Sequence, residues 1–258
     1  MLSTWYSGIL FVLLSVALAW LGIRLVHRRG MGDLLRRHNE IAGPIHATLG
    51  VIYAVLLAFV VITVWEQFSE AEDALADEAN IVTALVRNAE GIDSASGARL
   101  RSDLIAYIHA VVEQEWPVLT EGETEVSESP AYDRVWRTVL DIHPQSVREE
   151  TWFGVLVAGM DRLDNARNAR LLSADSAVPT AMWVLLIIGG IITVLFACFF
   201  GAEHRRLHFA MVAALAATIA FTLFMIAAID HPYTGVVRVE PEAYRHAMEE
   251  LEGLGTRD

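Results

Sequence analysis

Four long apolar stretches, all without Asp, Glu, Lys or Arg, constrain this 258-residue chain more than any motif. They run from Trp5 to Ile23, from Ile45 to Trp65, from Thr180 to Phe200 and from Phe209 to Ile229. A bilayer core is crossed by about 20 apolar residues in a helix, and a helix satisfies all its backbone polar groups in lipid. The sequence therefore predicts an all-α membrane protein with four transmembrane helices.

Arginine in the short loops predicts the orientation. Five Arg separate the first two stretches, and Arg205 and Arg206 separate the last two. Short Arg-rich loops remain in the cytoplasm. Residues 66–179, with 22 acidic and 9 basic side chains, and both termini would then be extracytoplasmic. The first stretch lacks a preceding basic region and exceeds a signal-peptide core, so we expect a retained anchor.

These patterns divide the chain into four parts. Residues 1–65 form a first transmembrane pair with a basic cytoplasmic loop, and residues 66–179 form an acidic extracytoplasmic domain. Residues 180–229 form the second pair, and residues 230–258 form an extracytoplasmic tail. The expected location is the bacterial cytoplasmic membrane, with the chain crossing it several times.

The acidic domain is predicted to be a helical bundle continuous with the second span. No Pro occurs from Ile45 to Glu90, and Gly91 supplies a stop signal. The outer half of this helix carries an apolar stripe at three- and four-residue steps: Phe68, Ala71, Leu75, Ala79, Val82 and Val86.

Three further helices are expected in this domain. The first runs from about Ser96 to Trp116 and is ended by Pro117. The second has Ser129 as its N-cap and Pro130 at its first position. The third begins with a capping box at Ser146 to Glu149. Together with the extended second span they predict a four-helix bundle.

Several segments resemble one protein family. They are Gly50 to Phe59 with Val64 to Glu66, Arg167 to Leu171 before Pro179 and Trp183, and Asp230 to Gly235 with Val239 to Pro241. In these residues the chain is similar to the bestrophin-like domain family of bacterial membrane proteins. The resemblance implies kinship with bestrophins, which are oligomeric anion channels.

Small residues in the second span suggest close helix packing. Ala47, Gly50, Ala54 and Ala58 recur at steps of three, four and four, a spacing that lets helices approach closely. Packing against another span of the same chain is the favoured interpretation. The alternative is a pore or a seam between subunits, for which Gly50, Tyr53 and Ala54 are candidates.

Polar residues at the span ends are candidates for a pore mouth. Asn39 precedes the second span, Glu66 ends it, and Asp230 ends the fourth. A symmetric ring of Glu66 or Asp230 would attract cations. The favoured alternatives are an ion pair of Glu66 with Arg167 or Arg170, and a cap or turn role for Asp230.

An acidic stripe, defined as Glu66, Glu70, Asp73 and Asp77, occupies the second helix beyond the span. Like charges four residues apart destabilise a helix by a few tenths of a kcal/mol per pair, so a compensating partner is expected. Arg162, Arg167 and Arg170 are the favoured partners. A bound divalent cation such as calcium, or a solvated face, are the alternatives.

Two classes of function remain open. One is a homo-oligomeric ion channel in the lipid bilayer with an acidic outer vestibule; electrostatics favour inorganic cations and the family resemblance favours anions. The other is a non-conducting sensor or scaffold that binds a partner through its helical head. The sequence carries no catalytic motif and suggests no enzyme and no cofactor. A net charge of −13 argues against nucleic-acid binding.

Overall fold

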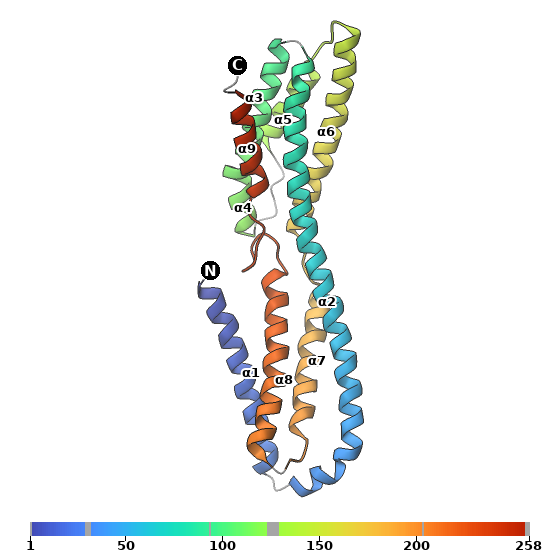
Figure 1. The fold of residues 1–258 in the computed structure, drawn as a ribbon, viewed down its shortest axis with the longest axis vertical. Helices are drawn as coiled ribbons and strands as arrows, with labels where there is room; N and C mark the ends of the chain where they lie inside the picture. Colours follow the sequence, from blue (N-terminus) through green and yellow to red (C-terminus); the bar gives the residue numbers. More distant parts are fainter. Residues whose placement is uncertain (1, 29–31, 93, 123–128, 203, 256–258) are drawn as a thin grey trace. The chain divides into compact units, whose positions relative to one another are not determined.

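The computed structural model describes residues 2–28, 32–92, 94–122, 129–202 and 204–255. Within these ranges every regular element is a helix, which confirms the predicted all-α fold (Figure 1). The main helices are α1 (Leu2–Arg28), α2 (Gly32–Asn88), α3 (Ser94–Ala110), α4 (Trp116–Thr120), α5 (Pro130–Leu140), α6 (Val147–Ala174), α7 (Thr180–Cys198), α8 (Arg205–Ile229) and α9 (Glu242–Gly255). A 3-10 turn (Ala89–Gly91) follows α2, and a π-helical turn (Val111–Glu115) joins α3 to α4.

The chain divides into two units. Unit 1 comprises residues 1–66 and 177–230, and unit 2 comprises residues 67–176 and 231–258. The long helix α2 contributes its first part to unit 1 and its second part to unit 2. Residues 231–255, part of the tail expected at 230–258, lie in the same unit as the acidic segment.

Unit 1 contains the four predicted spans. Helices α1, α2, α7 and α8 each contain a segment long and apolar enough to cross a membrane, which confirms that prediction. One core packs Tyr53, Val60 and Val64 of α2 against α7 and α8. A second core packs α1 against the ends of α7 and α8 around Ala19, Cys198 and Ala216. Many Leu, Ile and Val side chains of these helices face outward, as expected for surfaces in contact with lipid.

The start of α2 differs from the prediction. The helix begins at Gly32, well before Ile45, and includes Pro44 in its interior. Proline lacks the N–H group of a regular helical turn and its ring crowds the preceding turn, so a helix bends there. Figure 1 shows α2 changing direction near its start.

Unit 2 is a helical bundle around the second part of α2. The predicted apolar stripe is confirmed, because Phe68, Ala71, Leu75, Ala79, Val82 and Val86 are all buried. The N-caps are confirmed as well: the Ser129 hydroxyl accepts from the Tyr132 N–H, and the Ser146 hydroxyl accepts from the Glu149 N–H at 3.2 Å.

Two features of unit 2 were not predicted. Pro117 does not end a helix; it occupies the first turn of α4, where its missing N–H costs little. The C-terminal residues form α9, which lies beside α3 (Figure 1) and buries Tyr244, Ala247 and Leu251. Among the described residues the bundle therefore contains two helices, α4 and α9, beyond the four expected.

Candidate functional site

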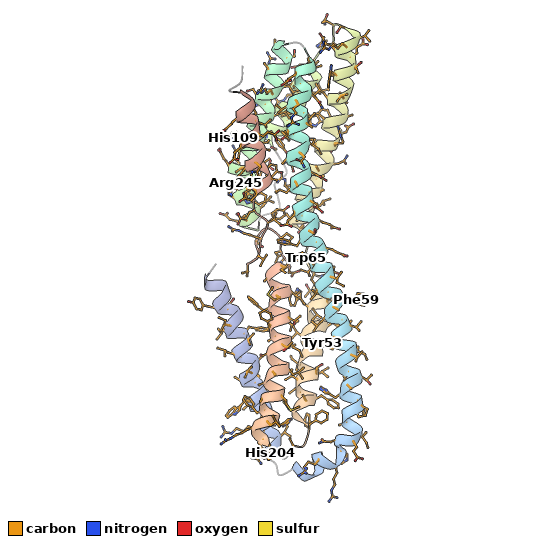
Figure 2. All side chains as sticks on the ribbon, viewed as in Figure 1. Tyr53, Phe59, Trp65, His109, His204 and Arg245 are labelled. Carbon is orange, nitrogen blue, oxygen red and sulfur yellow. The ribbon has the colours of Figure 1, made fainter. Side chains whose placement is uncertain are left out.

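Tyr53 packs inside unit 1. Its ring is 4% exposed and its hydroxyl donates to the Leu186 carbonyl oxygen at 3.0 Å. A Cβ on Gly189 or Gly190 would come within 2.8 Å of the Tyr53 side chain, so these glycines permit the contact. In Figure 2 Tyr53 points from α2 toward α7. Tyr53, a candidate for the pore alternative, instead joins two helices of the same chain.

The small-residue stripe of α2 is not covered by other described residues of the chain. Ala47, Ala54 and Ala58 are exposed and Gly50 is half-buried. A Cβ on Gly50 would meet no atom within 4 Å. The favoured interpretation, packing against another span of the same chain, is therefore wrong. The stripe is available to lipid or to another subunit.

A third face of α2 carries large apolar side chains. Val55, Phe59 and Ile62 are 48%, 64% and 54% exposed, and Figure 2 shows Phe59 on the outer side of the helix. Steps of four and three residues place them on one face. Continuing the same spacing along α2 leads from Ile62 to Glu66 and then to the acidic stripe.

The acidic stripe is solvated. Glu66, Glu70, Asp73 and Asp77 are all exposed, and none forms an ion pair with a described residue. The expected pairing with Arg162, Arg167 and Arg170 is not found among the described residues: Arg167 and Arg170 bind other carboxylates, and Arg162 donates to the Ala158 carbonyl oxygen. Among the described residues no group of three or more His, Cys, Asp or Glu side chains is arranged to hold a metal ion.

Two of the mouth candidates join helices of unit 1. Asn39 donates to the Gly201 carbonyl at 2.8 Å and accepts from the Gly201 N–H at 3.1 Å. Asp230 is 6% exposed and accepts from the Val178 N–H at 2.7 Å and from the Trp183 indole at 3.1 Å. These contacts fit the favoured structural role of Asp230 better than an exposed mouth, because its carboxylate connects the end of α8 to the start of α7.

A buried ion network occupies the centre of unit 2, formed by two carboxylates and two guanidinium groups. Arg170 donates from Nε to Glu78 and from Nη2 to Glu115, each at 2.7 Å. Arg167 donates from Nη1 to both oxygens of Glu115, at 2.9 and 2.7 Å. Glu78 and Arg170 are 0% exposed, and all four side chains are buried. Their formal charges cancel.

Tyrosines enclose the ion network. The Tyr107 hydroxyl of α3 donates to Glu78, and Tyr233 exchanges a hydrogen bond with Ser173 at 3.1 Å. Tyr244 of α9 is fully buried near Glu78. Helices α2, α3, α6 and α9 therefore meet around one polar centre.

The surroundings shift the pKa values of several groups in and around the network. Burial alone would raise the pKa of Glu115, but the Arg170 charge and the Arg167 hydrogen bond outweigh it and lower that pKa. Burial, followed by the negative charge of Glu78, raises the pKa of Tyr107 and of Tyr244 well above the ordinary value. The Glu115 carboxylate and the neutral phenols of Tyr107 and Tyr244 are thus the favoured forms near neutral pH.

Sequence reasoning missed this network, although a signal was present. Glu78 follows Leu75 by three residues and precedes Val82 by four, so it falls on the predicted apolar stripe. Arg167 and Arg170 likewise continue the apolar spacing of Leu163 in α6. A charged residue in phase with an apolar stripe indicates a buried ion pair.

The comparisons with known proteins agree with this architecture. The family model for the Bestrophin-like domain matches residues 9–244. The chain belongs to the Bestrophin-like family. No curated protein matches it.

Solved structures with a similar fold include crystal structures of a bacterial Bestrophin homolog from Klebsiella pneumoniae. A variant of that homolog matches with a TM-score of 0.70 at 15% identity, covering 97% of this chain and 100% of that chain. The structure solved by zinc phasing matches with a TM-score of 0.69 at 15% identity, covering 97% and 99%. This Bestrophin-like chain therefore shares its whole fold with those proteins.

Proposed function

We propose that this Bestrophin-like chain forms a homo-oligomeric ion channel of the cytoplasmic membrane, with α2 lining the pathway. The observation that carries the proposal is that α2 exposes large apolar side chains in unit 1, at Val55, Phe59 and Ile62, and the acidic stripe that begins at Glu66. The family to which the chain belongs, whose name refers to a class of channels, supports the same function.

Several copies are needed to enclose a pathway. The four spans of unit 1 pack around apolar cores, and the described residues of those cores provide no polar conduit. The exposed stripe of Ala47, Gly50, Ala54 and Ala58 offers a helix face that a neighbouring subunit can approach closely. Closed symmetric assembly would then direct a repeated face of α2 toward the axis.

The two parts of the exposed α2 face suggest two roles. An apolar constriction at Phe59 gates by wetting and dewetting. An acidic wall from Glu66 to Asp77 raises the local concentration of cations and repels anions within about a Debye length, roughly 8 Å at physiological salt. We therefore favour conduction of cations, against the anion selectivity that the name bestrophin implies.

Ion flux into liposomes tests the function. Reconstituted protein is expected to pass potassium or calcium faster than chloride. Phe59→Ala is expected to increase the flux by widening the apolar constriction, whereas Phe221→Ala, a control at an exposed position of α8, leaves it unchanged. Absence of flux for all three ions would overturn the channel and favour the non-conducting scaffold.

The acidic face has its own test. Asp73→Asn is expected to reduce the ratio of cation to chloride flux, whereas Glu72→Gln, an exposed neighbour about 100° around the helix, leaves the ratio unchanged. Equal effects of the two variants would show that the acidic stripe does not face the pathway.

The orientation of the acidic unit stays a prediction from loop charge. It is tested by adding one labelling site to a Cys198→Ala background, because Cys198 is the only native cysteine. Arg162→Cys is expected to react with an impermeant maleimide outside intact cells, and Arg206→Cys only after lysis. The reverse pattern would place unit 2 in the cytoplasm, and the channel proposal would not depend on that result.

A further inference from the structure

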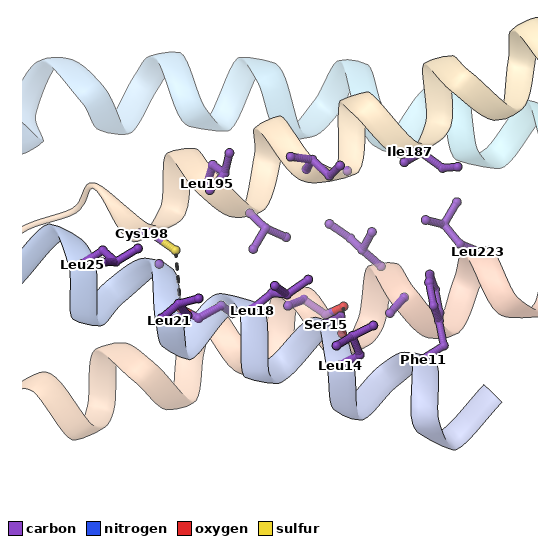
Figure 3. A pocket seen from close by; sticks show the side chains of 18 residues that line it. Phe11, Leu14, Ser15, Leu18, Leu21, Leu25, Ile187, Leu195, Cys198 and Leu223 are labelled. Carbon is purple, nitrogen blue, oxygen red and sulfur yellow. Dashed lines mark hydrogen bonds between the residues drawn. The ribbon is translucent and has the colours of Figure 1, made fainter. Parts of the chain in front are cut away.

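An apolar slot runs between α1 and α7, with α8 as its floor (Figure 3). It has a volume of about 500 Å³, within the range of sites that bind small molecules. Leu18 and Ile191 form its rims and are 59% and 53% exposed. Ala216 and Ala220 form its floor and are 2% and 3% exposed. The small floor residues make the slot deep.

The slot has no free polar group to offer a ligand. Its one hydroxyl, on Ser15, donates to the Val12 carbonyl oxygen of its own helix at 2.7 Å. A ligand with polar atoms at this depth would lose hydrogen bonds to water and gain none, which costs several kcal/mol. The matching ligand is therefore a hydrocarbon.

The slot narrows at the end where α7 finishes. There the Cys198 thiol lies 3.9 Å from the Ala19 carbonyl oxygen, and a Cβ on Gly22 would come within 3.2 Å of the same sulfur. An α-helix with its side chains is about 10 Å across. Because the walls of the slot meet at one end, the slot accommodates a linear acyl chain more readily than the helix of a second subunit.

Basic residues lie at this same end of unit 1. Arg205 is the first residue of α8, and the steps from Arg205 through Phe209 and Val212 to Ala216 keep it on the face that forms the slot floor. His204 (Figure 2) and Arg206 are adjacent, and all three side chains are exposed. Basic clusters at the end of transmembrane helices bind anionic lipid headgroups.

We propose that the slot binds one acyl chain of an anionic glycerophospholipid whose phosphate contacts Arg205 and Arg206. The slot supplies apolar contact along the chain, and the arginines supply the preference for an anionic headgroup. Helix α1 is then held to α7 partly through lipid. This site is independent of ion conduction.

Native mass spectrometry of the full chain provides the test. Protein is extracted from nanodiscs containing equal amounts of phosphatidylglycerol and phosphatidylcholine with identical chains. One retained phosphatidylglycerol per subunit is expected. Ile191→Trp fills the slot and is expected to abolish retention of that lipid. Ile188→Trp, a control at an equally exposed α7 position outside the slot, is expected to retain it.

The headgroup contact is tested separately. Arg205→Gln is expected to reduce retention of phosphatidylglycerol about fivefold, the effect of one basic residue near a membrane surface. Arg24→Gln is the control, because Arg24 stacks on Trp20, away from the slot residues of α1. Equal retention of the two lipids by the wild-type protein would overturn the anionic preference.

Photocrosslinking of the wild-type protein keeps the proposal testable if a variant fails to fold. A phosphatidylglycerol with a diazirine on its acyl chain is expected to label residues around Leu21 and Cys198. Labelling confined to positions outside the slot would overturn the proposal.

Discussion

Asp77 and Glu78 are neighbours on α2, yet their carboxylates have opposite surroundings. Asp77 is exposed and has no ion-pair partner among the described residues, whereas Glu78 is 0% exposed and bound by Arg170 and Tyr107. One residue along a helix is a rotation of about 100°, enough to move a side chain from solvent to the core. The comparison separates charges that act on ions in solution from charges that hold helices together.

The stability of the buried ion network depends strongly on each of its members, because the network's charges balance. Two carboxylates and two guanidinium groups share one desolvated site, so removing either kind leaves an uncompensated charge. The free energy of unfolding that is lost when one partner is removed is far larger than the free energy that the intact pair contributes relative to apolar residues of the same shape. The exposed carboxylates of the acidic stripe carry no such desolvation cost, so substitutions there can change function with little loss of stability.

Removal of Arg170 is expected to have the largest effect. Arg170→Met leaves Glu78 buried without its cation and should lower the free energy of unfolding by about 3–5 kcal/mol. Asp77→Asn on the exposed side should change it by less than about 0.5 kcal/mol. Thermal unfolding in detergent, followed by tryptophan fluorescence, measures both. Equal stability of the two variants would break the distinction between the two sets.

Asp230 extends the comparison to unit 1. Asp230→Ala removes the acceptor of the Val178 N–H and of the Trp183 indole, and should lower stability by about 1–3 kcal/mol. Asp175→Ala, at the C-terminal end of α6, is the control. Loss of stability without a change in Trp183 fluorescence would argue against the indole contact.

The buried network also predicts a stability maximum between acid and alkaline pH. The folded-state pKa of Glu115 is lowered, so its stabilisation is present above the ordinary carboxyl pKa and is lost as pH falls through the folded value. The folded-state pKa values of Tyr107 and Tyr244 are raised. Their phenols ionise only in the unfolded chain above about pH 10, so stability falls as pH rises further.

A single substitution tests the loss of stability on the alkaline side of the maximum. Tyr244→Phe should reduce the loss of stability between pH 10 and 11 by about 1 kcal/mol, because the unfolded phenol, half ionised at its ordinary pKa of about 10, becomes almost fully ionised over that interval. Tyr6→Phe, at an exposed position, should leave the loss unchanged. Unfolding curves at several pH values check the expectation, and identical curves for both variants would contradict it.

The smallest stability effect is expected at the acidic stripe. Replacing Glu66, Glu70, Asp73 and Asp77 by their amides removes like charges at adjacent helical turns and should stabilise α2 by a few tenths of a kcal/mol per pair. A fall in stability would show that an assembled neighbour pairs with the stripe. Chemical unfolding at low and high salt distinguishes the two results.

The sequence was sufficient for the spans and most helices because length, periodicity and caps are local signals. Val82 and Val86 repeat with the helix period, and Ser129 precedes a proline in a capping pattern. Tyr53 was misplaced because an aromatic ring in a span carries no information about which helix it contacts. That contact depends on Gly189 and Gly190, far away in sequence.

Charge was harder to interpret than apolarity. The sequence showed arginines in α6 and carboxylates on α2, and predicted that the two would meet. It assigned the arginines to the exposed stripe because that stripe is regular, whereas Arg170 binds Glu78 and Glu115. Glu115 comes from a π-helical turn that no propensity rule predicted. Its partner could be known only from the three-dimensional arrangement.

The π-helical turn at Val111–Glu115 has a consequence for sequence comparison. Such a turn holds about one residue more than the α-helical turn it replaces, which shifts the phase of everything downstream by about 100°. An alignment with a relative whose helix is regular here must open a one-residue gap between Tyr107 and Trp116. Without that gap, Glu115 is matched to a position on the wrong side of the helix, and the partner of the two arginines goes unrecognised.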